Sequence, residues 1–204
     1  MDLKETYNRI AFDWHHDHSH DDWWKEGTDI FIQKISSGAC VLDVGCGSGV
    51  KATYLMEHGC KVVGIDISDT LLEMARREVP EGDFRELSMT DLDTMEEMFD
   101  GVFAQASLLH IPKKDAGDVV KKMAGRLVPG GFLYIAVKEV REGKPDEEVK
   151  KEYDYGYEYE RFFSYFTMIE LERYLTDAGL EIVSTLRNQH PSGKTVWLQI
   201  IGRK

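Results

Sequence analysis

Cysteine is scarce in this chain of 204 residues, and long apolar runs are absent from it. The three cysteines, Cys40, Cys46 and Cys60, form no CxxC pair, and no apolar leader is visible in the N-terminal stretch MDLKETYNRI. An odd number of cysteines without such a leader is typical of a reducing compartment. Because no apolar stretch reaches the roughly 18–20 residues of a membrane span, we expect a cytoplasmic protein outside the membrane.

Basic residues are fewer than acidic ones, with 25 Lys and Arg against 37 Asp and Glu and a formal net charge of -12 at pH 7. This charge repels nucleic-acid backbones and anionic membranes, and no run of Lys and Arg forms a basic patch that would offset it. The sequence therefore predicts no nucleic-acid partner and no membrane partner. Its hydrophobic content of 42% and its length fit one globular domain spanning 1–204.

From about residue 39 onward, the sequence alternates between strand and helix patterns. Strands are predicted at 39–44, 61–65, 84–87, 101–106, 132–137 (after a Pro-Gly-Gly turn), 180–186 and 195–201. Helices are predicted at 50–58, after the capping residue Ser68, at 113–127, and after the capping box of Thr167 and Glu170. This alternation is typical of an α/β fold with a mostly parallel sheet and helices on both faces. The last two strands flank a His-Pro-Ser-Gly turn and predict a hairpin, which requires one antiparallel strand.

A glycine-rich loop follows the first of these strands, in the stretch VLDVGCGSG. Glycines after a strand of a parallel sheet let a ligand approach the backbone where such sheets bind ligands. The spacing Gly45-x-Gly47-x-Gly49 differs from the G-x-G-x-x-G dinucleotide fingerprint, because position 50 is Val. Asp43, just before the loop, would repel a pyrophosphate and attract a ligand that carries an ammonium and a sulfonium group, such as S-adenosylmethionine. The alternative is that Asp43 merely ends the strand.

A second acid, Asp66, ends the strand pattern VVGIDIS and lies 23 residues after Asp43. An acid about 20 residues beyond a glycine loop accepts hydrogen bonds from ribose hydroxyls in nucleotide-binding folds. Alone, Asp66 could equally cap the helix that follows. The loop and the acid together favour an adenosyl ligand.

With these motifs, the chain resembles the class I S-adenosylmethionine-dependent methyltransferase family over about residues 39–204. VLDVGCGSG, VVGIDIS and LVPGG are the most specific parts of the resemblance. It implies a Rossmann-like, doubly wound sheet of seven strands with an antiparallel last strand, in three α/β/α layers. It also implies S-adenosylmethionine as the cofactor and S-adenosylhomocysteine as the product. The patterns ASLLHIP and RFFSYFT resemble small bacterial and archaeal members whose acceptors are unidentified.

The resemblance further implies which residues contact the cofactor. Those expected around its methionine part are Gly45, Gly47, Gln105 and Ala106, with Asp43 beside them. Those expected around its adenosine part are Asp66 at the ribose, Ile67 beside the adenine, and Met89, Thr90 and Asp91 in the loop that cradles the adenine. Tyr7 resembles an N-terminal tyrosine that closes over the cofactor in small members.

Methyl transfer is an in-line displacement on a carbon that a positive sulfur already activates, so the protein mainly has to align the acceptor with the methyl group. A hydroxyl or carbon acceptor usually needs a base as well. The candidate catalytic base is His110, which follows the fourth strand at the rim where the methyl group should emerge. The alternative is that His110 packs on or caps the turn at Pro112 and transfers no proton.

Two segments lie outside the alternation: residues 1–38, which we predict to form an N-terminal lid, and an insertion at 139–166, which we predict to form a flap on the acceptor side. The stretch HHDHSHDD at 15–22 has the composition of a metal site, but we interpret it as a solvated loop of the lid with no functional metal. The aromatic residues of 153–166 are interleaved with acids. They would either line a pocket for a cationic or amine-bearing acceptor or pack on the sheet edge within a partly exposed flap.

The leading hypothesis is an enzyme that methylates a small-molecule acceptor and acts as a monomer or a homodimer. The alternatives are a non-catalytic sensor of S-adenosylmethionine or S-adenosylhomocysteine, and a nicotinamide oxidoreductase on a similar sheet. Methylation of protein or nucleic acid is disfavoured by the charge and by the lack of a recognition domain in this sequence. In addition, the sequence after the fourth strand reads Ala-Ser-Leu-Leu rather than an Asn/Asp-Pro-Pro-aromatic run.

Overall fold

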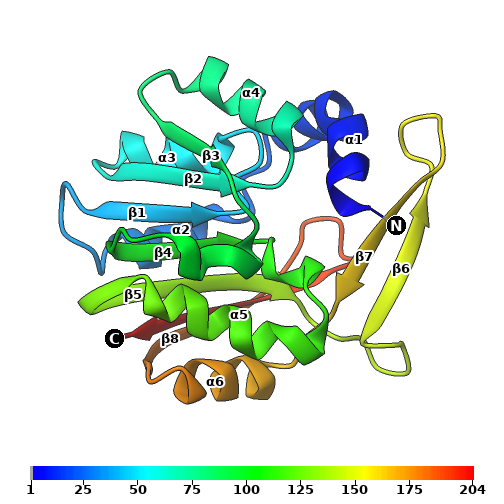
Figure 1. The fold of residues 1–204 in the computed structure, drawn as a ribbon. Helices are drawn as coiled ribbons and strands as arrows, with labels where there is room; N and C mark the ends of the chain where they lie inside the picture. The colour runs from blue at the N-terminus through cyan, green and yellow to red at the C-terminus, as the bar shows by residue number, and fades with distance from the viewer. Residues whose placement is uncertain (1) are drawn as a thin grey trace.

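A central sheet of seven strands organises the structure, a computed structural model that describes residues 2–204. The strands are β1 (Cys40–Val44), β2 (Lys61–Asp66), β3 (Asp83–Glu86), β4 (Phe99–Gln105), β5 (Leu127–Lys138), β8 (Glu181–Gln189) and β9 (Val196–Arg203). Their order is β3-β2-β1-β4-β5-β9-β8 (Figure 1). β9 is antiparallel to both β5 and β8, and the remaining neighbours are parallel. The predicted doubly wound sheet with an antiparallel last strand is therefore confirmed.

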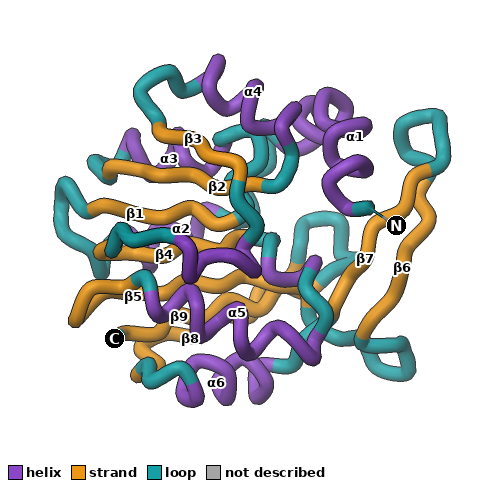
Figure 2. The backbone as a smooth tube through the Cα atoms, viewed as in Figure 1, coloured by secondary structure: helices purple, strands orange, loops and turns teal. Residues whose placement is uncertain are grey.

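Helices pack on the sheet in two layers (Figure 2). They are α2 (Lys25–Ile32), α3 (Val50–Glu57), α4 (Asp69–Glu78), α5 (Lys113–Gly125) and α6 (Met168–Asp177). The first helix, α1 (Leu3–His18), lies beyond the ends of the strands, against α4 and β7 (Tyr159–Ser164) (Figure 1). Two separate apolar clusters define the layers, one with Phe31 of α2 and Leu55 of α3, the other with Val120 of α5 and Leu175 of α6. A parallel sheet needs both faces covered, because its strands carry apolar side chains on both. Of the helices within residues 2–204, none combines the length and the apolar character needed to cross a membrane.

The helix starts follow the capping residues that the sequence predicts. The Ser68 hydroxyl accepts a hydrogen bond from the Leu71 amide, 3.2 Å away, at the start of α4. At the start of α6, Thr167 and Glu170 form a reciprocal capping box. Each side chain satisfies backbone N–H groups that have no partner inside the helix.

Two local expectations are corrected by the structure, and one segment has secondary structure that the sequence did not predict. β5 begins at Leu127, so the Pro-Gly-Gly segment lies inside an irregular strand rather than in a turn that precedes it. The first four residues of the histidine-rich stretch, 15–18, complete the last turns of α1 instead of forming a loop, because the helix pattern continues through them. Finally, the insertion contains a β-hairpin of β6 (Glu147–Glu152) and β7 (Tyr159–Ser164), which forms a two-stranded sheet of its own.

The contact between α2 and the sheet depends on Gly27. A Cβ atom at Gly27 would lie 1.4 Å from Gln199 Oε1 and 2.9 Å from the Tyr134 hydroxyl oxygen. Gln199 is 2% exposed, and its Oε1 accepts a hydrogen bond from the Tyr134 hydroxyl at 2.7 Å. Gln199 therefore cannot move aside without breaking a buried hydrogen bond.

We expect Gly27→Ala to lower the free energy of unfolding by about 1–3 kcal/mol, because the added methyl group overpacks this contact. Urea denaturation followed by circular dichroism measures the change. Gly125→Ala is the matched control, because Gly125 also lies in a helix and its Cβ would meet nothing within 4 Å. An equal loss of stability in both variants would contradict this account of the packing.

Candidate active site

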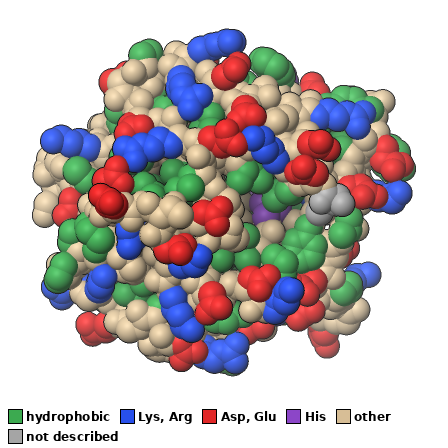
Figure 3. Space-filling model, in the orientation of Figure 1, with side chains coloured by type: hydrophobic (Ala, Val, Ile, Leu, Met, Phe, Trp, Pro, Cys, Tyr) green, Lys and Arg blue, Asp and Glu red, His purple; other side chains and the backbone are tan. Residues whose placement is uncertain are grey.

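A partly open cavity of about 840 Å³ lies beyond the carboxyl ends of β1, β2 and β4, with α1 across it. Figure 3 shows hydrophobic side chains around a hollow on this side of the molecule, with a histidine side chain visible inside it. The cavity brings together nine of the residues predicted from the sequence: Tyr7, Gly45, Gly47, Asp66, Ile67, Met89, Gln105, Ala106 and His110. Three other predicted residues, Asp43, Thr90 and Asp91, are not among those that line it.

The glycine loop is held by backbone hydrogen bonds to the end of β2. The amides of Gly45 and Cys46 donate to the Ile65 carbonyl oxygen at 2.8 Å and 3.0 Å. Gly45 has a φ of +76°, and a Cβ atom there would lie 2.4 Å from the Cβ of Ser107. Both the positive φ and the close approach require glycine. The loop therefore leaves backbone, rather than side chains, exposed to the cavity at this point.

The carboxylate of Asp66 joins the ends of two strands. Its Oδ2 accepts a hydrogen bond from the Gly47 amide, and its Oδ1 accepts one from the Ser68 amide, both at 2.9 Å. Burial raises the pKa of Asp66, while hydrogen bonds from backbone amides act in the opposite direction. Each oxygen keeps a second lone pair, so the carboxylate can still accept hydrogen bonds from a ligand in the cavity.

Asp43 is 1% exposed, so it is buried beneath the cavity surface instead of contacting a ligand directly. Burial raises its pKa to about 7; Lys51 opposes this shift and Asp66 adds to it. Within residues 2–204, Asp43 Oδ2 has no hydrogen-bond partner, and neither do two buried atoms of the cavity wall, Gln105 Nε2 and Ser107 Oγ. Buried polar atoms without partners are costly, so these two wall atoms fit a polar ligand group.

The other end of the cavity is apolar. Ile67, Leu71, Leu87 and Met89 line it, and their side chains suit a flat, largely apolar ring. Thr90 and Asp91 belong to a 3₁₀-helical segment (Met89–Thr94) and are exposed. Ser88 Oγ lies 2.7 Å from Thr90 Oγ1, so the side chain of Thr90 bonds within its own segment.

The side chain of His110 bridges α1 and the hairpin. Its Nδ1 lies 2.7 Å from the Phe162 carbonyl oxygen, and its Nε2 lies 2.7 Å from the Tyr7 hydroxyl. A carbonyl oxygen only accepts, so Nδ1 carries the proton and Nε2 accepts a hydrogen bond from Tyr7. Burial lowers the pKa of His110 to about 3. The imidazole is therefore neutral at physiological pH and a weak base.

Sequence reasoning missed several residues that line the cavity, among them Trp14, Lys51 and Ser107. Trp14 lies seven positions after Tyr7, which is two helical turns and therefore the same face of α1, so the helical period was a usable signal. Its ring comes within 3.6 Å of the position that a Cβ of Gly47 would take. The α1 helix is also fastened beside the glycine loop, where His15 Nδ1 lies 2.8 Å from Ser48 Oγ.

Neither the histidine-rich stretch nor the insertion lines the cavity. The stretch contacts the glycine loop through His15 of α1, and the insertion contacts His110 through the Phe162 carbonyl. No group of three or more His, Cys, Asp or Glu side chains in the described part of the chain is arranged to hold a metal ion. The cavity-lining residues within 2–204 come from outside 139–166. Instead of packing on the edge of the large sheet, Tyr157 donates a hydrogen bond to Asp13 of α1 at 2.9 Å, and the guanidinium of Arg9 lies 4.3 Å from its ring centre.

The raised pKa of Asp43 predicts how stability depends on pH. The folded state holds this proton more tightly than the unfolded chain, where the pKa is near 3.8, so the stabilisation is lost as the pH rises towards and through 7. Asp43→Asn removes this dependence. The quantity to compare is the free energy of unfolding of the variant minus that of the native chain. We expect this difference to be larger at pH 8.5 than at pH 5.5, by about 2 kcal/mol.

Urea denaturation at the two pH values measures this difference. Asp118→Asn, at an exposed carboxylate of α5, is the control and should show no such gain. A gain for Asp43→Asn that is the same at both pH values would refute the assignment of the proton to Asp43.

Comparisons with known proteins agree with this site. Residues 41–131 match the family model described as a methyltransferase domain. Methyltransferase GfsG of Streptomyces halstedii is 39% identical over 114 residues, which cover 52% of this chain and 40% of that protein. A ubiquinone biosynthesis O-methyltransferase of Chromobacterium violaceum is 30% identical over 133 residues, which cover 56% of each chain. The chain thus spans about half of the length of these curated relatives.

Solved structures share the fold at lower identity. The 1,6-didemethyltoxoflavin-N1-methyltransferase of Burkholderia thailandensis, with bound 1,6-didemethyltoxoflavin and S-adenosylhomocysteine, is 22% identical with a TM-score of 0.79 and matches 99% of this chain and 87% of its own. The magnesium protoporphyrin IX methyltransferase of Synechocystis, with bound S-adenosylhomocysteine, is 17% identical with a TM-score of 0.71 and matches 99% and 98%. The matched segment begins in the strand before the glycine loop and ends with LVPGG, so residues 41–131 are similar to the methyltransferase-domain family, and the fold is shared with structures of S-adenosylmethionine-dependent methyltransferases.

Proposed function

We propose that this protein transfers the methyl group of S-adenosylmethionine to a small-molecule acceptor. The observation that carries the proposal is one cavity with an apolar end and, next to the glycine loop, a carboxylate and unpartnered polar atoms. Such a cavity suits a ligand that joins an adenine ring, a ribose and an amino-acid group. The similarity of residues 41–131 to the methyltransferase-domain family and the names of the relatives support the same activity.

The residues of the cavity fit each part of this cofactor. The apolar end, with Ile67 and Met89, would hold the adenine, and the free lone pairs of Asp66 would accept hydrogen bonds from the ribose hydroxyls. Gln105 Nε2 and Ser107 Oγ would form hydrogen bonds with the amino-acid end, which would supply the partners that these two atoms lack. When bound, S-adenosylmethionine supplies a methyl group on a positively charged sulfur.

On the acceptor side, the chain supplies orientation rather than a strong base. The hydroxyl hydrogen of Tyr7 is donated to His110, and the Arg161 guanidinium also hydrogen-bonds the Tyr7 oxygen, so one lone pair is left to accept a hydrogen bond from an acceptor N–H or O–H group. The neutral, weakly basic imidazole of His110 holds that hydroxyl in place. This arrangement suits an acceptor that arrives as a ready nucleophile, and alignment alone can supply roughly 7–11 kcal/mol of the barrier reduction.

A small acceptor is favoured by the cover that α1 provides over the cavity through Leu3, Tyr7 and Trp14, since a polymer would need an open groove. The net charge of -12 disfavours nucleic acid in the same way. Small molecules are also the acceptors named for similar proteins, such as 1,6-didemethyltoxoflavin. A cytoplasmic location, where both S-adenosylmethionine and metabolites are available, fits this activity.

The test has two stages. Calorimetry with S-adenosylhomocysteine should show binding, with NAD as the negative control that excludes the oxidoreductase alternative. The protein is then incubated with methyl-labelled S-adenosylmethionine and a metabolite extract, and labelled small molecules are identified by mass spectrometry. A labelled product supports the proposal. Binding without any labelled product would point to the sensor alternative, and the absence of binding would refute both.

We expect Asp66→Asn to weaken S-adenosylhomocysteine binding about 10- to 100-fold, because it removes charged acceptors for the ribose hydroxyls and weakens the hold on Gly47. Calorimetry measures the change. Asp91→Asn is the control: Asp91 was also predicted to contact the cofactor, but it lies outside the residues that line the cavity. Its affinity should stay within about threefold of the native value. Equal losses in the two variants would count against the geometry described above.

A further inference from the structure

The hairpin of β6 and β7 reaches the site through one side of β7. The Phe162 carbonyl oxygen accepts the hydrogen bond from His110 Nδ1, and two residues later the Ser164 hydroxyl donates to the Ile111 carbonyl oxygen at 2.7 Å. β6 and β7 form a separate sheet, and their link to the seven-stranded sheet lies just beyond β7, where the Phe166 amide donates to the Lys138 carbonyl oxygen at 3.0 Å and the Val140 amide donates to the Phe166 carbonyl oxygen at 2.9 Å. Further interactions hold β7 against the turn that carries His110.

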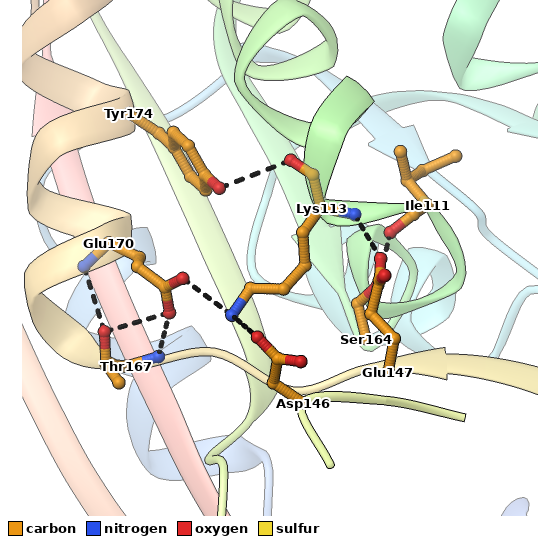
Figure 4. A network of polar contacts seen from close by, with 8 residues as sticks. All are labelled: Ile111, Lys113, Asp146, Glu147, Ser164, Thr167, Glu170 and Tyr174. Carbon is orange, nitrogen blue, oxygen red and sulfur yellow. Dashed lines mark hydrogen bonds and ion pairs between the residues drawn. The ribbon is translucent and has the colours of Figure 1, made fainter.

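Glu147 supplies one part of that hold. Its Oε1 accepts a hydrogen bond from the Lys113 amide at 2.6 Å and lies 3.3 Å from Ser164 Oγ, whose single hydrogen is donated to the nearer Ile111 carbonyl oxygen (Figure 4). The helix α5 begins after Pro112, whose side chain offers no capping hydrogen bond. A carboxylate from the hairpin therefore takes the place of a local cap, which also suits the positive end of the helix dipole.

The Lys113 side chain supplies the other part. Its Nζ lies 3.0 Å from Asp146 Oδ2 and 2.6 Å from Glu170 Oε1, between the start of the hairpin and the start of α6 (Figure 4). The second oxygen of Glu170 accepts hydrogen bonds from the amide and the hydroxyl of Thr167 at 2.8 Å and 2.9 Å. The ammonium group thus links α5, the hairpin and the capping box of α6.

This cluster differs from an ordinary surface ion pair. The Lys113 side chain is 15% exposed, and although burial disfavours its charge, the hydrogen bonds that it donates to Glu170 and Asp146 raise its pKa overall. The same contacts lower the pKa of Asp146 and help to lower that of Glu170. All three groups therefore keep their charges at neutral pH, and a charge network with several partners holds geometry better than an isolated exposed pair.

We propose that Lys113 and Glu147 are positioning residues, which hold β7 so that the Phe162 carbonyl keeps the proton of His110 on Nδ1. Nε2 is then available to accept from the hydroxyl of Tyr7, a residue that lines the cavity. Neither residue touches the cofactor or the acceptor. The effect of these residues on methyl transfer rests on the proposed function. The position of the proton on the His110 ring does not, because it can be measured in the protein without any ligand.

The primary test is ¹⁵N NMR of the His110 ring, assigned by comparison with His110→Gln. In the native protein, Nδ1 should give the signal of a protonated nitrogen and Nε2 that of an unprotonated one. In Lys113→Met and in Ser164→Ala, we expect the two signals to move towards each other as both tautomers become populated. Lys113→Arg keeps the charge and should restore most of the native separation. Ser164→Ala is a small change that keeps the proposal testable if Lys113→Met fails to fold.

Lys121→Met is the matched control, because Lys121 lies on the same helix but is 54% exposed and pairs only with Asp118 among the residues described. It should leave the ring signals unchanged. In the labelled-extract assay, Lys113→Met should lower kcat at least tenfold while S-adenosylhomocysteine binding stays within threefold. A purely structural role predicts a lower Tm with unchanged ring signals, and that result would overturn the proposal. Altered ring signals in a protein that methylates nothing would uphold the positioning role and reject the proposed function.

Discussion

The hydrogen bond between the Asp66 carboxylate and the Gly47 amide is the interaction on which the site depends. It joins the end of β2 to the loop that follows β1, so two neighbouring parallel strands share one binding edge. The opposite oxygen of Asp66 bonds the amide of Ser68, which caps α4. One carboxylate therefore orders a loop and a helix start and still has lone pairs for a ligand. A partly buried carboxylate with two amide donors stays in one place, as a binding group must.

The acceptor side is built differently, from segments that are far apart in the sequence. Tyr7 comes from α1, His110 from the turn after β4, and the carbonyl that bonds His110 comes from Phe162 of β7. This line of hydrogen bonds crosses three elements that are not joined by the pairing of the large sheet. Its geometry therefore depends on how the lid and the hairpin are fastened, and less on the rigid core below.

Burial gives the polar groups of the site their chemical character. It keeps His110 neutral, raises the pKa of Asp43, and leaves Gln105 and Ser107 with polar atoms that lack partners within residues 2–204. The unpartnered atoms of Gln105 and Ser107 are unfavourable for the protein without a ligand. Both residues line the cavity, whereas Asp43 lies beneath its surface and His110 is on the acceptor side. The site thus resembles other functional sites, in which polar groups are held in position for a ligand at a cost in folding stability.

The sequence by itself determined the seven-stranded sheet, the helices α3 to α6 and the position of the glycine loop, because these depend on short-range patterns: apolar periodicity, capping residues and glycine spacing. The helices α1 and α2 and the β6–β7 hairpin were not predicted. Asp66 and the loop could be placed together, since parallel strands bring their ends to one edge. The burial of Asp43, the exposure of Thr90 and Asp91, and the inward face of Trp14 were decided only by tertiary packing. The same holds for the pairing of His110 with Tyr7 and Phe162, because residues separated by 103 and 52 positions meet only when the lid and the hairpin are folded onto the sheet.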